Sequence, residues 1–318
     1  MSSNQSLSLR WDTVIGANVL PLHADGSIDS GSLERHLNAL VDSGIDVVFV
    51  NAVTGEGPLM TPAEREEVLQ LAVRTVGDRA AIGACLHPAS TEEAVRTAAI
   101  MRDQGAAAIL VFPHPEFAGR PMDAVTPVGY LEAIHRASGL PLAIYQTTRG
   151  SGMQFTPTVL AELAAVDGVA AIKEGSWDLG DYYTTYERFG ADRSPAAVLA
   201  DGDTLLGAML RLGTDGVMSG GTAAVASRLV QSVCRSADHG RASGDEVWLK
   251  RLTDALYRAP FGDFRARAKS ILSARGEIAT PAMRAPLRPI DDAEVLTLVE
   301  LASSVDDAPI RATGGERP

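Results

Sequence analysis

The sequence predicts an α/β protein: a (β/α)8 barrel, or TIM barrel, with a helical appendage at its C-terminal end. Short apolar runs alternate with longer amphipathic stretches, which is the pattern of parallel strands joined by helices. Eight such pairs occur within residues 13–240, and eight strand–helix units close a barrel in roughly 250 residues. Three further helical stretches follow without another strand-like run.

A chain of 318 residues is long enough for one large α/β domain with an appendage, and for a sizeable core. The patterns divide it into four parts. We expect an N-terminal extension over residues 1–12, the barrel over 13–240, C-terminal helices over 241–305 and a disordered tail over 306–318.

The expected strands are short apolar runs, many with β-branched centres, as is typical of buried parallel strands. They cover residues 13–20, 47–53, 80–85, 106–112, 140–146, 169–174, 197–200 and 215–219.

The helices show a 3.6-residue periodicity, and several begin at recognisable capping residues. Thr61 is followed by Pro62 and, three residues after the threonine, by Glu64, which is the pattern of a capping box. We expect helices over residues 28–43, 61–76, 90–104, 123–138, 156–166, 179–189, 203–211, 222–239, 245–258, 264–275 and 291–304.

The net charge of −12 and the pI near 5.0 argue against a nucleic-acid-binding protein, since no Lys/Arg cluster offsets the acidic balance. No apolar run reaches the ~18 residues of a membrane span. Cys85 and Cys234 lack metal-ligand or redox-motif spacing, so we expect reduced thiols. The polar residues 1–8 do not have the layout of a signal peptide. We therefore expect a cytoplasmic protein without membrane or nucleic-acid partners.

The stretch V-A-A-I-K-E-G-S over residues 169–176 is typical of a buried strand that ends in a lysine. A buried ammonium group must be paired or neutralised. In a dry pocket we expect Lys173 to lose its proton easily and to act as a nucleophilic amine toward a ketone. A strand-end lysine by itself more often reaches solvent, so the functional interpretation depends on other residues. Glu174 should point away from the pocket, because side chains alternate along a strand.

Active sites of such barrels lie at the C-terminal ends of the strands. Tyr145 ends the run P-L-A-I-Y, one strand before Lys173, so its phenol is placed to move protons beside the amine. An isolated tyrosine is more often a core residue, but the pair is more informative than either member. Val53, Thr54 and Gly55 form a turn whose amides and hydroxyl suit a small carboxylate. A plain strand–helix turn explains them equally well.

Further polar groups are expected at the variable end of the substrate. His114 lies between two prolines in F-P-H-P-E-F, which makes its loop stiff, although a surface position is the simpler interpretation. No second histidine has ligand spacing, so we expect no metal site and no cofactor. The remaining expected substrate-binding residues are Gln146, Arg149, Ser219 and Gly220.

Several dispersed motifs in this order resemble the dihydrodipicolinate synthase / N-acetylneuraminate lyase family of Schiff-base pyruvate aldolases. The resemblance covers residues 14–304, nearly the whole chain. The motifs are G-A-N-V-L-P-L-H-A-D-G-S-I-D, T-G-E followed by L-M-T-P-A-E-R-E-E-V, I-Y-Q at Tyr145, A-I-K-E at Lys173, D-G-D at 201–203, G-T-D-G-V-M-S and M-R-A-P-L-R-P-I.

The resemblance implies a barrel enzyme, usually a homotetramer built from dimers, in which Lys173 forms the Schiff base with a 2-oxo acid such as pyruvate. It also implies that Tyr145 is the proton shuttle and that residues 53–55 hold the substrate carboxylate. Members of the family make or break a C–C bond with an aldehyde partner, or remove water from 2-keto-3-deoxy sugar acids with the same lysine. A non-catalytic 2-oxo acid binding protein is a third hypothesis.

The sequence departs from the lysine-pathway members at three places. The first threonine of their G-T-T-G-E pattern is Val53 here, and their P-Y-Y segment is Pro113-His114-Pro115. Their arginine, five residues after the tyrosine, is replaced by Gly150, with Arg149 one residue earlier. These differences argue against dihydrodipicolinate synthase itself, and they suggest His114 as a replacement acid/base or substrate contact.

Overall fold

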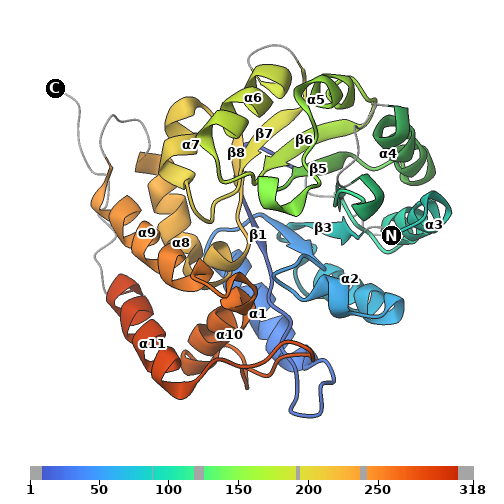
Figure 1. Ribbon diagram of the computed structural model, residues 1–318. Coiled ribbons are helices and arrows are strands. Elements are labelled where there is room, and N and C mark those ends of the chain that lie inside the picture. Colours follow the sequence, from blue (N-terminus) through green and yellow to red (C-terminus); the bar gives the residue numbers. More distant parts are fainter. Residues whose placement is uncertain (1–8, 88, 118–124, 191–193, 237–241, 307–318) are drawn as a thin grey trace.

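The computed structural model describes residues 9–87, 89–117, 125–190, 194–236 and 242–306. Eight strands form a closed, all-parallel barrel in sequence order, with β1 paired to both β2 and β8 (Figure 1). The predicted fold is confirmed. The strands are β1 Val14–Ala17, β2 Val47–Val50, β3 Ala81–Leu86, β4 Ala108–Val111, β5 Leu142–Gln146, β6 Val169–Glu174, β7 Ala197–Ala200 and β8 Gly216–Met218.

The helices surround the barrel in the order that the sequence predicts. Thr61 and Glu64 form the predicted capping box of α2. The helices are α1 Ser30–Asp42, α2 Pro62–Val76, α3 Thr91–Asp103, α4 Val125–Ser138, α5 Pro157–Leu163, α6 Leu179–Phe189, α7 Leu206–Leu212, α8 Gly221–Ser236, α9 Gly244–Tyr257, α10 Phe264–Ala274 and α11 Asp292–Asp306. Short 3-10 turns include η1 Gly57–Leu59, η2 Pro115–Phe117, η3 Arg149–Ser151 and η4 Phe261–Asp263.

Several structural strands are shorter than predicted. The first predicted strand extends to residue 20, whereas β1 ends at Ala17. Val19 and Leu20 are nonetheless completely buried. The apolar run therefore marks residues that are buried, not only residues that pair in the sheet, and this explains why the predicted strand is too long.

The barrel encloses a small inner core, and the helices pack against a separate outer core. Phe49 fills the interior so closely that a Cβ on Gly83 would lie 2.4 Å from its ring. Trp11 packs against Phe49 with ring centroids 6.3 Å apart, and its carbonyl lies against Gly216 at the start of β8. The expected extension thus packs onto this end of the barrel from residue 9 onward, which leaves the opposite end for a site.

The three C-terminal helices lie together on one side of the barrel, next to α8 (orange to red in Figure 1). Arg267 of α10 is 1% exposed. It donates to the carbonyls of Leu256 and Arg258 at the C-terminal end of α9 and forms an ion pair with Glu294 of α11 at 2.6 Å. One buried guanidinium therefore joins all three helices. The expected disorder of the tail concerns residues that, apart from residue 306, lie outside the described part of the chain.

Within the described ranges, no helix is both long and apolar enough to cross a membrane. Cys85 is buried inside the barrel and Cys234 is half-buried, and neither forms a disulfide.

Candidate active site

A cavity of about 170 Å³ opens at the C-terminal ends of the strands, where barrel enzymes carry their chemistry. Side chains from β4, β5, β6 and the segments after β2, β7 and β8 reach it, together with rings from the C-terminal appendage. Its lining includes Ala52, Val53, Thr54, Phe112, Tyr145, Lys173, Trp177, Asp201, Asp203, Ser219, Gly220, Tyr257, Phe261 and Phe264.

Tyr145 and Lys173 are register partners on β5 and β6, so their side chains project from the same face of the sheet. The Lys173 Nζ lies 4.9 Å from the centroid of the Tyr145 ring, and the lysine side chain is 12% exposed. The predicted pair is therefore brought together, although each strand continues one residue further, to Gln146 and Glu174. Burial raises the pKa of Tyr145 above its usual range, so the phenol is protonated at neutral pH.

Asp201, directly after β7, supplies the carboxylate nearest to the lysine. Its Oδ2 lies 3.6 Å from Lys173 Nζ, its side chain is 2% exposed, and its Oδ1 has no hydrogen-bond partner among the described residues. Burial raises the pKa of Asp201 well above its usual value, Lys173 opposes this rise and Asp203 adds to it.

The free lysine does not lose its proton easily, contrary to the sequence-based expectation. Burial alone would lower the pKa of Lys173, but the charge of Asp201, helped by Tyr145 and Asp203, outweighs it and raises the pKa. The amine must therefore transfer a proton before it can attack a carbonyl. Asp201, at 3.6 Å, is the nearest acidic acceptor.

A glycine sets the distance between the acid and the phenol. A Cβ on Gly175 would lie 2.9 Å from Asp201 Oδ2 and 3.0 Å from the Tyr145 hydroxyl oxygen. Gly175 also donates its amide to the carbonyl of Gln146 at 2.9 Å. The backbone after β6 thus occupies the space between these two groups, and any side chain there would push them apart.

Residues 53–55 form the predicted tight turn. The Thr54 hydroxyl faces Gly220, where a Cβ would lie 2.6 Å from it. In the described structure the amides of Thr54 and Gly55 have no hydrogen-bond acceptor, whereas those of Glu56 and Gly57 bond to the carbonyls of Val53 and Ala52. Val53 and Thr54 line the cavity, and the turn offers donors for a carboxylate.

The glutamate of T-G-E has a structural role that sequence reasoning missed. Glu56 is completely buried in the left-handed region, at φ +56°, and forms an ion pair with the equally buried Lys269 of α10. The Arg284 amide donates to its second oxygen at 3.1 Å, and the Arg284 guanidinium binds Glu64 at 2.7 Å. The turn is therefore fixed to the C-terminal segment.

Asp203 organises the wall at the end of β8. Its oxygens accept hydrogen bonds from the Ser219 hydroxyl at 2.9 Å, the Gly220 amide at 3.2 Å and the Thr222 amide at 3.3 Å. The Ser219 hydroxyl is thus already engaged, so Ser219 and Gly220 lie at the site but are held by Asp203. Burial, followed by Asp203, raises the pKa of Tyr257 well above its usual value, and Tyr257 accepts from the Gly221 amide at 3.0 Å.

Two of the predicted substrate contacts, His114 and Gln146, are not among the residues that line the cavity. The His114 ring lies 6.1 Å from that of Tyr130, and its Nδ1 accepts from the Glu116 amide. Gln146 uses its side-chain amide to bind the backbone of Phe155 at 2.9 and 3.0 Å. Alternation along β5 explains this, because Gln146 faces opposite to Tyr145. The side chain of Arg149 lies outside the described part of the structure.

An aromatic wall closes the cavity on the appendage side. Trp177, after β6, packs edge-on against Phe261 at 5.1 Å, and Tyr257 lies 5.1 Å from Phe264. Trp177 adopts φ +58°, an uncommon conformation for a bulky residue that often marks a functional site. The other three rings come from α9, η4 and α10, and the expected site does not include any of the four.

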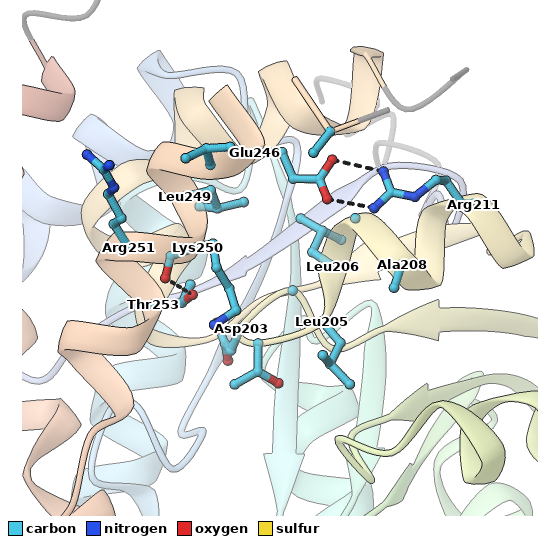
Figure 2. Close-up of a pocket in the computed structure, with 15 residues that line it drawn as sticks. Asp203, Leu205, Leu206, Ala208, Arg211, Glu246, Leu249, Lys250, Arg251 and Thr253 are labelled. Carbon is cyan, nitrogen blue, oxygen red and sulfur yellow. Dashed lines mark hydrogen bonds and ion pairs between the residues drawn. The ribbon is translucent and has the colours of Figure 1, made fainter. Parts of the chain in front are cut away.

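A second cavity of about 340 Å³ lies between α7 and α9 (Figure 2). Asp203 borders both cavities, but the lining of the second is mostly apolar and does not include Lys173. Arg211 and Glu246 form hydrogen bonds of 2.9 and 2.7 Å across one side. Gly207 lets α9 approach, since a Cβ there would lie 1.9 Å from Glu246 Oε1. We assign this cavity to the packing of the appendage. In the described ranges, no cluster of three or more His, Cys, Asp or Glu side chains could hold a metal ion.

Comparison with known proteins identifies the family of the chain. The sequence matches the dihydrodipicolinate synthetase family over residues 10–305. A DapA-like lyase of Halobacterium salinarum is 30% identical over 283 residues, covering 88% of this chain and 89% of the relative. The 4-hydroxy-tetrahydrodipicolinate synthase 1 of Streptomyces coelicolor is 30% identical over 279 residues, covering 86% and 88%.

Solved structures agree in fold. The chloride-inhibited dihydrodipicolinate synthase of Acinetobacter baumannii, complexed with pyruvate, is 25% identical with a TM-score of 0.81, covering 92% of this chain and 98% of that one. A dihydrodipicolinate synthetase homologue of Pseudomonas aeruginosa has a TM-score of 0.82 at 21% identity, covering 92% and 99%. The chain is a divergent member of the dihydrodipicolinate synthetase family, and it is a lyase of the aldolase type.

Proposed function

We propose that this lyase makes or breaks a C–C bond of a 2-oxo acid such as pyruvate through a Schiff base on Lys173. The observation that carries the proposal is the register pairing of Tyr145 with Lys173 inside the cavity, at 4.9 Å between amine and ring. The pyruvate-bound relative from Acinetobacter baumannii supports a 2-oxo acid as substrate.

In the proposed reaction, Asp201 accepts a proton from the Lys173 ammonium, and the amine attacks the ketone carbon. The ketone oxygen takes one proton from the attacking nitrogen and a second from Tyr145 and leaves as water, so that a protonated imine and the Tyr145 phenolate remain. The amides of Thr54 and Gly55 hold the substrate carboxylate. The Tyr145 phenolate then removes a proton from C3, and the electrons of that C–H bond move toward the imine nitrogen to give an enamine, which is the nucleophile for an aldehyde.

Lysine count makes the test unusually clear, because the chain has three lysines, Lys173, Lys250 and Lys269. Lys250 is surface-exposed and Lys269 is fully buried in its ion pair. Incubation with pyruvate, reduction with borohydride and peptide mass spectrometry should place the adduct on the Lys173 peptide. Lys173→Ala should abolish it, and Lys250→Ala should leave it unchanged. An adduct on Lys250 alone, or none with pyruvate or longer 2-oxo acids, would contradict the proposal and favour a non-catalytic binding protein.

A hydro-lyase acting on a 2-keto-3-deoxy sugar acid is the second candidate, since it would use the same imine. The apolar wall of four aromatic rings favours the aldolase, because a polyhydroxylated chain would leave its hydroxyls unpaired there. Two activity assays distinguish the candidates. An aldolase releases pyruvate from a 4-hydroxy-2-oxo acid, whereas a hydro-lyase removes water from a 2-keto-3-deoxy sugar acid.

The family resemblance further suggests a homotetramer or homodimer. Leu179 and Tyr183 on α6 are 41% and 54% exposed, and they supply apolar surface for such a contact. Light scattering on the purified protein tests this, and a monomer at micromolar concentration would contradict it.

A further inference from the structure

We infer that the second substrate of the Lys173 site is an uncharged aromatic aldehyde, bound against the wall of Trp177, Tyr257, Phe261 and Phe264. This rests on the proposed function, because it assigns the partner of the same imine. The wall and the lysine line one continuous cavity. A molecule attached to the enamine therefore extends toward these rings.

The rings of the wall contact one another, but one of them is only partly covered. Trp177 lies edge-on to Phe261 at 5.1 Å and to Tyr257 at 5.9 Å, which are distances that favour ring contacts. Phe261 is nevertheless 45% exposed. An apolar ring at the mouth of a cavity, only half covered by protein, gains contact area when a planar apolar ligand enters.

The charges at the site exclude an acidic aldehyde. Among the described lining residues, Lys173 is the one cation, and it is consumed in the imine. Asp201 and Asp203 are 2% and 5% exposed, and they add carboxyl groups to the site but no cation. A second carboxylate on the aldehyde would lose its hydration without gaining a positive partner.

The site also offers what the aldehyde carbonyl needs. The enamine carbon attacks the aldehyde carbon, and the π electrons of the carbonyl move to its oxygen, which takes the Tyr145 proton. The new hydroxyl can then donate to Asp201 Oδ1, which has no partner among the described residues. Water hydrolyses the imine and releases a 4-aryl-4-hydroxy-2-oxo acid with regeneration of the Lys173 amine. The reaction is redox-neutral and needs no further reactant.

The experiment compares aldehydes of different chemistry with pyruvate as the common partner. Benzaldehyde represents the aromatic class, succinic semialdehyde the acidic class and glyceraldehyde the hydroxylated class. We expect kcat/KM for benzaldehyde to exceed both others by at least about tenfold, because burying a hydroxyl or carboxylate against the aromatic wall without a hydrogen-bond partner costs more than about 1.4 kcal/mol. Equal or better turnover of succinic semialdehyde or glyceraldehyde would overturn the inference.

Variants test where the ring binds. Phe261→Ala should raise KM for benzaldehyde about three- to tenfold, the size of one aromatic contact, with little change in kcat. Leu296→Ala, at an apolar position on α11 that is 72% exposed, is the matched control and should change neither. An unchanged KM in Phe261→Ala would contradict the assigned position.

Borohydride trapping with pyruvate separates the two levels of the argument, because it needs no aldehyde. Trapping on Lys173 that persists in Phe261→Ala, together with failure of benzaldehyde as substrate, overturns the aldehyde class alone. Absence of trapping in the unmodified protein overturns the Schiff-base function and the inference with it.

Discussion

Lys173 and Lys269 are both buried beside a carboxylate, but their surroundings differ. Lys269 is completely buried, contacts Glu56 directly and donates a second hydrogen bond to the Ala282 carbonyl at 2.8 Å. Lys173 lines a cavity and lies 3.6 Å from Asp201, beyond ordinary hydrogen-bond distance. A lysine whose donors are satisfied in a sealed contact holds the fold together. One with an incomplete pair at a cavity is available for chemistry.

The pKa shifts of the two amines run in opposite directions. Burial, with Arg284 and Arg265 nearby, lowers the pKa of Lys269 even though Glu56 opposes the shift. At Lys173 the effect of burial is outweighed by Asp201, and the pKa rises. Burial alone therefore does not identify a reactive lysine. The distance of the lysine from its carboxylate partner and the free space around the amine distinguish a reactive lysine from a structural one.

The largest expected effect is the loss of activity in Lys173→Met. Removal of the proposed covalent nucleophile should lower kcat by at least about a thousandfold, whereas the thermal midpoint should change little, since the side chain lies at a cavity. Coupled assays of pyruvate release and thermal unfolding give the two readouts. Retained turnover with a collapsed melting temperature would reverse the roles that we assign to the two lysines.

The next effect concerns the sealed pair. Glu56→Gln leaves the Lys269 ammonium buried without its counter-charge and should lower the free energy of unfolding by about 3–5 kcal/mol. The double variant Glu56→Gln, Lys269→Met removes both charges and should recover most of that loss. Urea unfolding of the three proteins measures it. If the double variant is no more stable than the single one, the pair is not the source of the stability.

Much of this architecture follows from local sequence patterns. The eight alternating runs predict the barrel, and the positions of Tyr145 and Lys173 on successive runs predict that they meet, because parallel strand ends share one edge. The capping box at Thr61 is equally local. In each case neighbours along the chain carry the information.

The missed residues depend on contacts between distant segments. Asp201 belongs to a short D-G-D motif, and nothing in that motif says that its first carboxylate faces Lys173. Tyr257, Phe261 and Phe264 lie in the C-terminal appendage, where the sequence pattern indicates ordinary helix-packing residues. For His114, the two flanking prolines predict a stiff loop, but they do not predict which way its side chain turns.

The next prediction concerns Glu174, which follows Lys173 on β6 and points to the opposite face of that strand. Burial raises its pKa to about 7, with Asp181 and Asp178 adding to the rise. Between about pH 4.5 and 7 the native protein then binds more protons than the unfolded chain, so stability falls as the pH rises. Glu174→Gln removes this penalty. It should be more stable than the parent protein by up to about 3 kcal/mol at pH 8 and similar to it near pH 4. Urea unfolding across pH measures the difference, and a gain confined to low pH would contradict the shift.

The smallest expected effect is a shift in the pH dependence of imine formation. Asp201→Asn removes the charge that keeps Lys173 protonated, so burial dominates and the pKa of the amine falls. The pH midpoint for borohydride-trapped pyruvate adduct should move down by at least about one unit. Glu174→Gln is the control, because that side chain leaves the same strand on the opposite face, and its midpoint should stay in place. A midpoint in Asp201→Asn that is unchanged or higher would mean that Asp201 does not set the protonation of Lys173, and the contrast between the two buried lysines would then rest on cavity space alone.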